Sequence, residues 1–278
     1  MPTPSERDPS PPVRFRDLLL GAGLLAGPAN VIMQLCRPGV GYGVLESRVD
    51  SGKATLHPIK RARTTASYLA VAALGTDEER TIYRRAVDTS HAAVRSTADS
   101  PLRYSAFDPD LQLWVAACLW VGFRDAYERF GAPLDDAAWE AAYREAAVLG
   151  TTLQVPPDRW PADLAAFDRY WTDGLARVRL DEPVRRYLTD LILLRHLPFP
   201  VRLAFGRLDL FLTTGFLPPR FREEMRLPWD ERRQRRFDRL TRAVRAVVSR
   251  CPPAVRRFPF NAYLADLRRR IRAGRPLV

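Results

Sequence analysis

The chain has 278 residues, of which 46% are hydrophobic and 27% are charged. This balance is typical of a globular protein with a large core, and it excludes a disordered chain or a small disulfide-stabilised domain. Cys36, Cys118 and Cys251 are far apart in the sequence and form no paired motif, so we expect core residues of a cytoplasmic protein. Residues 1–12 are rich in Pro and Ser and predict a disordered leader, and residues 13–278 predict a single domain.

The net charge of +12 arises in the C-terminal segment 220–275, where 18 arginines accompany 6 acidic residues. Within 229–250, apolar residues recur at helical spacing, so we expect the arginines on the solvent face of an amphipathic helix. No aromatic-interleaved basic patch accompanies the charge, and we therefore expect no specific nucleic acid partner. Weak contact with an anionic membrane surface stays open. The expected apolar stripe consists of Phe237, Leu240, Val244, Val247 and Val248.

The first predicted element lies in the long uncharged stretch 18–36. Several glycines and Pro28 interrupt this stretch, whereas a membrane-spanning helix keeps about 20 consecutive apolar residues. We therefore expect a buried helix with a break. Glu46 follows soon after, in the apolar run VGYGVLESR. A carboxylate in such surroundings needs a partner, and a salt bridge to a nearby arginine is the simplest one.

The next predicted helix carries Arg61 and Thr65, which are four residues apart and so share one face. It ends at Gly75. By default, such a pair makes a hydrogen bond on the helix face. Lys60 and Thr64 have the same spacing, and the sequence does not decide between the two pairs.

Thr76 and Glu79 have the spacing of a capping box and predict the start of another helix. This helix carries His91 on the same face as apolar residues, so His91 is expected to point into the core. The chain has only three histidines, and the other two, His57 and His196, lie close to helix boundaries. His91 is therefore the best candidate for a site that needs an imidazole, although an inward histidine can equally be a satisfied core residue. The apolar residues on that face are Tyr83, Val87 and Val94.

Asp108 followed by Pro109 predicts the start of a helix that is apolar on all sides over 111–123 and therefore central and buried. Further helical periodicity follows in the rest of the chain, and no hairpin signal or internal repeat accompanies it. The sequence thus predicts an all-α fold. The expected helical segments are 135–150, 162–178, 182–196, 229–250 and 261–274.

A set of short motifs resembles the oxygenase MpaB family, which shares its catalytic domain with latex-clearing rubber oxygenase. The similarity covers nearly the whole chain. In chain order, the motifs are GPANVIMQ at 27–34, Glu46-Ser47, RxxxT at Arg61 and Thr65 followed by YLAVAALG, His91 with Val94, YSAFDPDLQLWV at 104–115, FLPPRFREEMRLPW at 216–229 and CPPAVRRFP at 251–259.

The resemblance implies a globin-like helical core that holds haem b, with His91 as the axial ligand of the iron. Arg61 and Thr65 would lie in the haem pocket, with Arg61 pairing with a haem propionate or with Glu46. Glu46 would be the catalytic acid or base. The implied reaction uses dioxygen for the oxidative cleavage of a C=C bond in an apolar, isoprenoid-like substrate.

Aromatic side chains are available for the wall of a haem slot. Two other functions compete with an oxygenase: a haem-binding protein without turnover, such as a sensor, and a basic helical module that binds membrane surfaces or nucleic acid. The sequence specifies neither the substrate nor the oligomeric state. The candidate wall residues are Trp114, Trp120, Phe123, Tyr127 and Trp139.

Overall fold

A computed structural model describes residues 13–49 and 53–278. In these ranges the chain is 68% helical, without strands, and the predicted all-α fold is confirmed. The predicted leader, residues 1–12, lies outside the described residues. The elements are η1 (Phe15–Leu18), η2 (Gly21–Ala26), α1 (Gly27–Leu35), α2 (Pro38–Leu45), α3 (Pro58–Leu74), α4 (Asp77–His91), α5 (Pro109–Phe130), α6 (Asp136–Glu145), α7 (Val148–Thr151), η4 (Pro157–Arg159), α8 (Leu164–Leu175), α9 (Glu182–Ile192), α10 (Phe199–Phe216), α11 (Pro219–Glu224), α12 (Glu231–Val248), α13 (Pro253–Arg256) and α14 (Phe260–Arg272).

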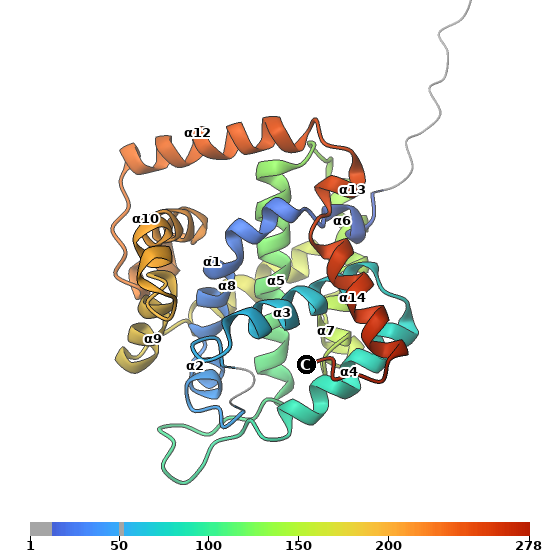
Figure 1. The fold of residues 1–278 in the computed structure, drawn as a ribbon, viewed down its shortest axis with the longest axis vertical. Helices are drawn as coiled ribbons and strands as arrows, with labels where there is room; N and C mark the ends of the chain where they lie inside the picture. The colour runs from blue at the N-terminus through green and yellow to red at the C-terminus, as the bar shows by residue number, and fades with distance from the viewer. Residues whose placement is uncertain (1–12, 50–52) are drawn as a thin grey trace, which may run out of the picture.

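Helix α5 runs through the middle of the molecule, and the other helices pack around it (Figure 1). The Asp108 carboxylate caps its first turn by accepting from the backbone N–H groups of Asp110 and Leu111, as the sequence predicts. Trp114 and Trp120 of α5 are fully buried. The predicted central, buried helix is therefore confirmed.

The predicted break in 18–36 is also confirmed, because two short 3-10 helices lead into α1, where Pro28 occupies the first turn. The described part of the chain contains no helix that is long and apolar enough to span a membrane. The capping box of α4 is present: the Glu79 backbone N–H donates to the Thr76 hydroxyl, and the Thr76 N–H donates to the Glu79 carboxylate.

Three details of the sequence prediction are wrong. Helix α4 ends at His91, so Val94 lies in the following loop. Helix α9 ends at Ile192, before His196, because Leu194 adopts a left-handed conformation (φ 53°). The side chain of Val247 is 65% exposed, although Phe237 of the same predicted stripe is buried.

Helix α10 follows no predicted segment. Its C-terminal half packs beneath α12, and the Phe216 and Phe237 rings meet edge to face with centroids 5.0 Å apart. Figure 1 shows α12 along the upper edge of the molecule, above α10 and the C-terminal end of α5. The exposed face of α12 carries most of its arginines, as the amphipathic pattern predicts.

The C-terminal helix α14 lies along α3 (Figure 1). Arg268 of α14 forms an ion pair with Glu79 at 2.6 Å and so joins the capping box of α4. Close to the start of α14, Gly21 touches the Phe258 carbonyl so closely that an added Cβ would lie 1.7 Å from the carbonyl oxygen. The segment around Gly21 and the segment that joins α13 to α14 are therefore in direct contact.

Candidate functional site

His91 is the last residue of α4 and is half-buried. Its Nδ1 lies 3.2 Å from Oε1 of Gln154, in the segment that follows α7. Burial lowers the pKa of His91, and the hydrogen bond to Gln154 opposes this effect. Phe107 borders the imidazole edge to face, with ring centroids 6.4 Å apart. Burial therefore favours the neutral form of the ring.

The environment of Gln154 fixes which nitrogen of His91 carries the proton. The Gln154 side-chain NH₂ donates to the Asp88 carboxylate, so its Oε1 is the atom that faces His91. An amide oxygen only accepts hydrogen bonds, and Nδ1 of His91 must therefore be the donor. Gln112 completes the cluster, because its Oε1 accepts from the Gln154 backbone N–H at 2.8 Å. This arrangement leaves the lone pair on Nε2 of His91 available for a ligand.

Arg61 and Thr65 are both exposed on α3, whereas Lys60 and Thr64 are half-buried. Thr64 donates its hydroxyl to the Lys60 carbonyl at 3.0 Å, so this second pair is engaged within the helix. The Arg61 guanidinium is close enough to lower the pKa of His91. Of the two pairs, only the Arg61–Thr65 pair therefore contributes a charge that changes the pKa of His91.

The same Arg61 charge also lowers the pKa of two tyrosines, although burial raises the pKa of both overall. One is Tyr83 of α4, whose hydroxyl donates to the Thr64 carbonyl at 2.8 Å. The other is Tyr187 of α9. Arg61 thus extends from α3 to within electrostatic reach of both α4 and α9.

Glu46 lies directly after the last residue of α2. Its Oε2 accepts hydrogen bonds from the Ser100 hydroxyl at 2.6 Å and the Tyr104 hydroxyl at 2.7 Å, both in the loop between α4 and α5. Among the described residues, Glu46 makes no ion pair, so the expected salt bridge to an arginine is wrong. Two hydroxyl groups satisfy the carboxylate instead.

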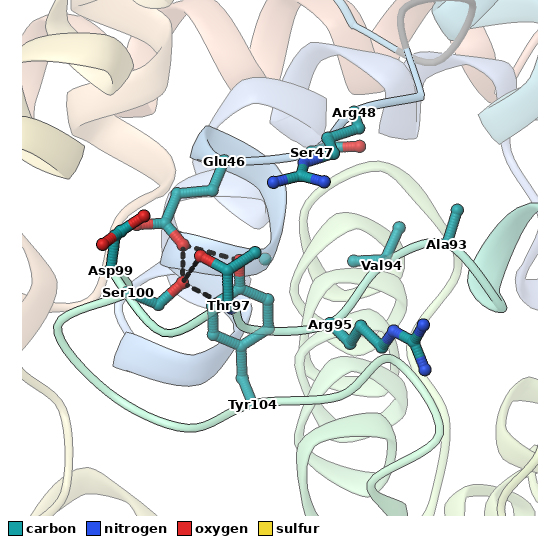
Figure 2. A pocket seen from close by; sticks show the side chains of 11 residues that line it. Glu46, Ser47, Arg48, Ala93, Val94, Arg95, Thr97, Asp99, Ser100 and Tyr104 are labelled. Atoms are coloured by element: carbon teal, nitrogen blue, oxygen red, sulfur yellow. Dashed lines mark hydrogen bonds between the residues drawn. The ribbon is translucent and has the colours of Figure 1, made fainter.

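These three side chains form one wall of a cavity of about 170 Å³ (Figure 2). Figure 2 shows the Glu46 carboxylate directed toward Ser100 and Tyr104, while Arg95 extends away from them. Pockets for larger organic ligands are about 300–1,000 Å³. The cavity is therefore of a size for water, dioxygen or a small fragment, and a haem would have to lie outside it.

The cavity and His91 are neighbours in the chain but not one site. Ala93 and Val94 line the cavity, and the Val94 N–H donates to the His91 carbonyl at 2.9 Å. His91 itself is not a lining residue. Its side chain instead joins the cluster that contains Gln154. The loop after α4 thus begins directly after His91, and its residues Ser100 and Tyr104 contact Glu46 at the end of α2.

The sequence prediction assigned aromatic residues of α5 and α6 to the wall of a haem slot. Trp114 stacks on Trp171 with ring centroids 5.1 Å apart, and Trp120 meets Tyr143 edge to face at 5.2 Å. Both tryptophans are fully buried. These rings fill the core by contacting other rings, so they do not bound an open slot.

The chemistry of the residues around His91 nevertheless fits a histidine that coordinates a haem iron. Burial favours the neutral imidazole, and its Nδ1 has a hydrogen-bond partner, so that Nε2 carries the lone pair with which histidine binds a metal. Arg61 supplies a nearby exposed cation for a propionate.

Sequence reasoning missed Gln154 as the partner of His91. Two other members of the site, Gln112 and Tyr104, occur in the motif YSAFDPDLQLWV that carries part of the family resemblance.

Comparison with known proteins places the chain in one family. Residues 16–246 match the family model described as "ER-bound oxygenase mpaB/B'/Rubber oxygenase, catalytic domain". Two uncharacterized proteins, from Mycobacterium bovis and Mycobacterium tuberculosis, are each 51% identical over 255 residues, which is 92% of this chain and 100% of each relative. No solved structure matches the chain. The chain therefore belongs to the family of the mpaB and rubber oxygenase catalytic domains.

Proposed function

We propose that this protein is a haem b-dependent oxygenase that uses dioxygen to oxidise an apolar substrate, with oxidative cleavage of an isoprenoid-like C=C bond as the reaction. The family match supports the oxygenase class. The observation that carries the haem assignment is the hydrogen bond between His91 Nδ1 and Gln154 Oε1, which leaves Nε2 free. In this proposal His91 would hold the haem iron through Nε2.

When bound, haem b would supply an iron that can bind and activate dioxygen. The protein's own contribution begins with His91, which is oriented by Gln154 and whose pKa is lowered by burial. Arg61 is exposed and close to His91, and we assign it to a haem propionate, since a guanidinium forms charge-assisted bonds with a carboxylate. We assign Thr65, one turn farther along α3, the role of an uncharged hydrogen-bond donor beside Arg61 in the haem pocket.

Glu46 is the proposed base. Its Oε2 is held by Ser100 and Tyr104, while no hydrogen bond to Oε1 occurs among the described residues. The free oxygen can accept a proton from an allylic carbon of the substrate, and the two hydroxyl donors fix the direction in which that oxygen points. This role requires the reacting part of the substrate to reach the cavity at the end of α2.

One observation favours a second function, a haem-binding protein without turnover. His91 is not among the residues that line the Glu46 cavity, so the proposed base and the proposed ligand occupy separate surroundings. A sensor needs only the ligand, whereas an oxygenase needs both groups to act on one substrate.

A spectroscopic titration followed by an oxygen assay tests both functions. The purified protein is titrated with haemin, and the Soret band is expected to saturate at one haem per chain. Oxygen uptake is then measured with an isoprenoid alkene and with the matching saturated hydrocarbon as control. Uptake that requires the alkene supports the oxygenase. Stoichiometric haem binding without uptake assigns the second function, and the lack of a Soret band contradicts both.

A further inference from the structure

The first half of α10 presents large apolar side chains to solvent. The side chains of Phe199, Leu203 and Phe205 are 63%, 69% and 56% exposed, and Val201 and Leu208 are also exposed. Single exposed apolar residues are normal on protein surfaces, but five exposed apolar side chains within ten residues of one helix mark an interaction surface. At helical spacing, Phe199 and Leu203 lie on one side of the helix, and Val201, Phe205 and Leu208 lie on another. We call residues 199–208 the α10 tip.

The α10 tip projects because only one of its sides is packed. Gly206 is buried against the end of α9, where an added Cβ would lie 3.1 Å from the Leu193 carbonyl oxygen. The other half of the helix is anchored in the core by buried residues that include Leu212 and Phe216. The C-terminal half of α10 thus holds the helix in the fold, and the N-terminal half stays accessible to a binding partner.

The charge around the tip has one sign. Between Asp190 and Asp209 the sequence contains no acidic residue, and it contains three arginines. Arg195 forms an ion pair with Asp190 at 2.7 Å. Arg202 and Arg207 are exposed, and neither is in an ion pair with a described residue. The Arg202 guanidinium lies 5.3 Å from the centre of the Phe199 ring, so one cationic group is in contact with an exposed aromatic side chain of the tip.

We propose that the α10 tip docks on an anionic lipid surface. Phenylalanine and leucine side chains enter the boundary between headgroups and acyl chains, while Arg202 and Arg207 contact lipid phosphates. The net charge of +12 attracts the whole molecule to the same surface.

The length of the α10 tip argues against a membrane-spanning helix, and its charge argues against a dimer formed through the tip. Ten helical residues extend about 15 Å, which is half of the roughly 30 Å hydrocarbon core, so the tip lies in the interface and does not cross it. A second copy of the chain would bring equal charges together, because each tip carries unpaired arginines, and like charges disfavour such an interface. The proposal does not depend on haem or on the oxygenase reaction.

Vesicle sedimentation with the full chain tests the proposal. Binding is measured to vesicles of phosphatidylcholine alone and to vesicles with 30% phosphatidylglycerol, and we expect binding to the anionic vesicles only. The Phe199→Ser/Leu203→Ser/Phe205→Ser variant should bind at least tenfold more weakly.

The matched control removes three equally exposed apolar side chains elsewhere, in the variant Val247→Ser/Val255→Ser/Phe258→Ser. It should bind within twofold of the wild type. A second test variant, Arg202→Glu/Arg207→Glu, keeps every apolar residue of the tip and should abolish the preference for anionic lipid. If circular dichroism shows that the triple serine variant is misfolded, the arginine variant alone tests whether the α10 tip binds anionic lipid.

Three results would overturn the proposal. The first is absence of binding to anionic vesicles. The second is an equal loss of binding in the control variant, which would assign the membrane contact to another surface. The third is a concentration-dependent dimer in sedimentation velocity that the triple serine variant loses, because the occupant of the α10 tip would then be a second copy of the chain.

Discussion

Gln154 Oε1 and His91 Nδ1 lie 3.2 Å apart, although the two residues are separated by 63 positions in the sequence. The contact joins the end of α4 to the segment after α7, and Asp88 holds the amide in place from one turn before His91. The orientation of the imidazole is therefore determined by tertiary packing as well as by α4 itself.

The first prediction concerns this partner. Gln154→Leu removes the acceptor for Nδ1–H, so His91 loses its fixed orientation and the affinity for haem should fall by roughly 10- to 100-fold. A haemin titration followed at the Soret band measures the change. Gln234→Leu, which alters a partly buried glutamine of α12 that accepts a hydrogen bond from Trp229, serves as the control and should keep the wild-type affinity. Unchanged affinity in Gln154→Leu would remove Gln154 from the site.

The second prediction concerns the ligand itself. His91→Ala should fold, as judged by circular dichroism, but should lose the Soret band of the wild type, because no described residue replaces the imidazole. His196→Ala is the matched control: His196 is also partly buried, and its Nδ1 has no hydrogen-bond partner. Full haem content in His91→Ala together with haem loss in His196→Ala would move the ligand to the turn before α10.

The third prediction tests the proposed base. Glu46→Gln retains an oxygen that accepts from Ser100 and Tyr104, yet it cannot take up a proton at neutral pH, so turnover should fall by roughly 10² to 10⁴ with unchanged haem content. Oxygen consumption, haem content and Tm are measured on one preparation. Tyr104→Phe removes only one donor and should reduce turnover less. Wild-type turnover with a lowered Tm would assign Glu46 to structure alone.

The fourth prediction concerns pH and stability. Asp209 has a buried Oδ2 without a partner, and burial raises its pKa from the usual 3.8 to about 6. The folded state binds this proton more tightly than the unfolded state, so the stabilisation is present below about pH 4 and is lost as the pH rises to about 6. Asp209→Asn should therefore raise the free energy of unfolding at pH 7 by roughly 1 kcal/mol, after allowance for partial exposure, and should have little effect at pH 3.

Urea denaturation at the two pH values measures this difference. Asp190→Asn is the control, since Asp190 is in an exposed ion pair with Arg195 and should contribute little at either pH. An equal effect of Asp209→Asn at both pH values would mean that the carboxyl does not titrate in this range.

The fifth prediction concerns the arginine-rich helix. The arginines of α12 lie on its exposed face, and the described helix brings no aromatic side chain to that face. Binding to duplex DNA should therefore be weak and should decrease steeply between 50 and 200 mM salt, as for non-specific phosphate contacts. Fluorescence anisotropy with two unrelated duplexes measures it. Tight binding to one of them at physiological salt would favour a nucleic acid partner.

The sequence predicted those elements whose ends are determined locally. The capping box at Thr76 and the Asp108 cap are satisfied by residues within three positions, so the starts of α4 and α5 are readable from the chain. Helix α10 was missed because it is apolar on several faces and lacks a 3.6-residue pattern. Its first half is exposed and its second half is buried, and no periodic apolar pattern separates the two.

In the candidate site, too, local sequence identifies some residues, whereas others become apparent only from the tertiary structure. The motifs of the family resemblance identified His91 and Glu46 as candidates. Their partners, Gln154 and Ser100, are 63 and 54 positions away, and only the fold brings them close. The exposure of Arg61 likewise depends on how α3 lies against α14, which no local pattern specifies. A globin-like arrangement of the core stays a prediction.

The match to the family ends at residue 246, but the contacts that support α4 continue beyond it. Arg268 of α14 holds Glu79 in the capping box of the helix that carries His91, and the Phe258 backbone rests on Gly21. A recombinant chain designed to end at the family boundary would lack both contacts and would uncover the face of α3 that α14 covers. Expression boundaries, and chimeras with relatives, should therefore retain the segment through α14 if the imidazole is to keep its position.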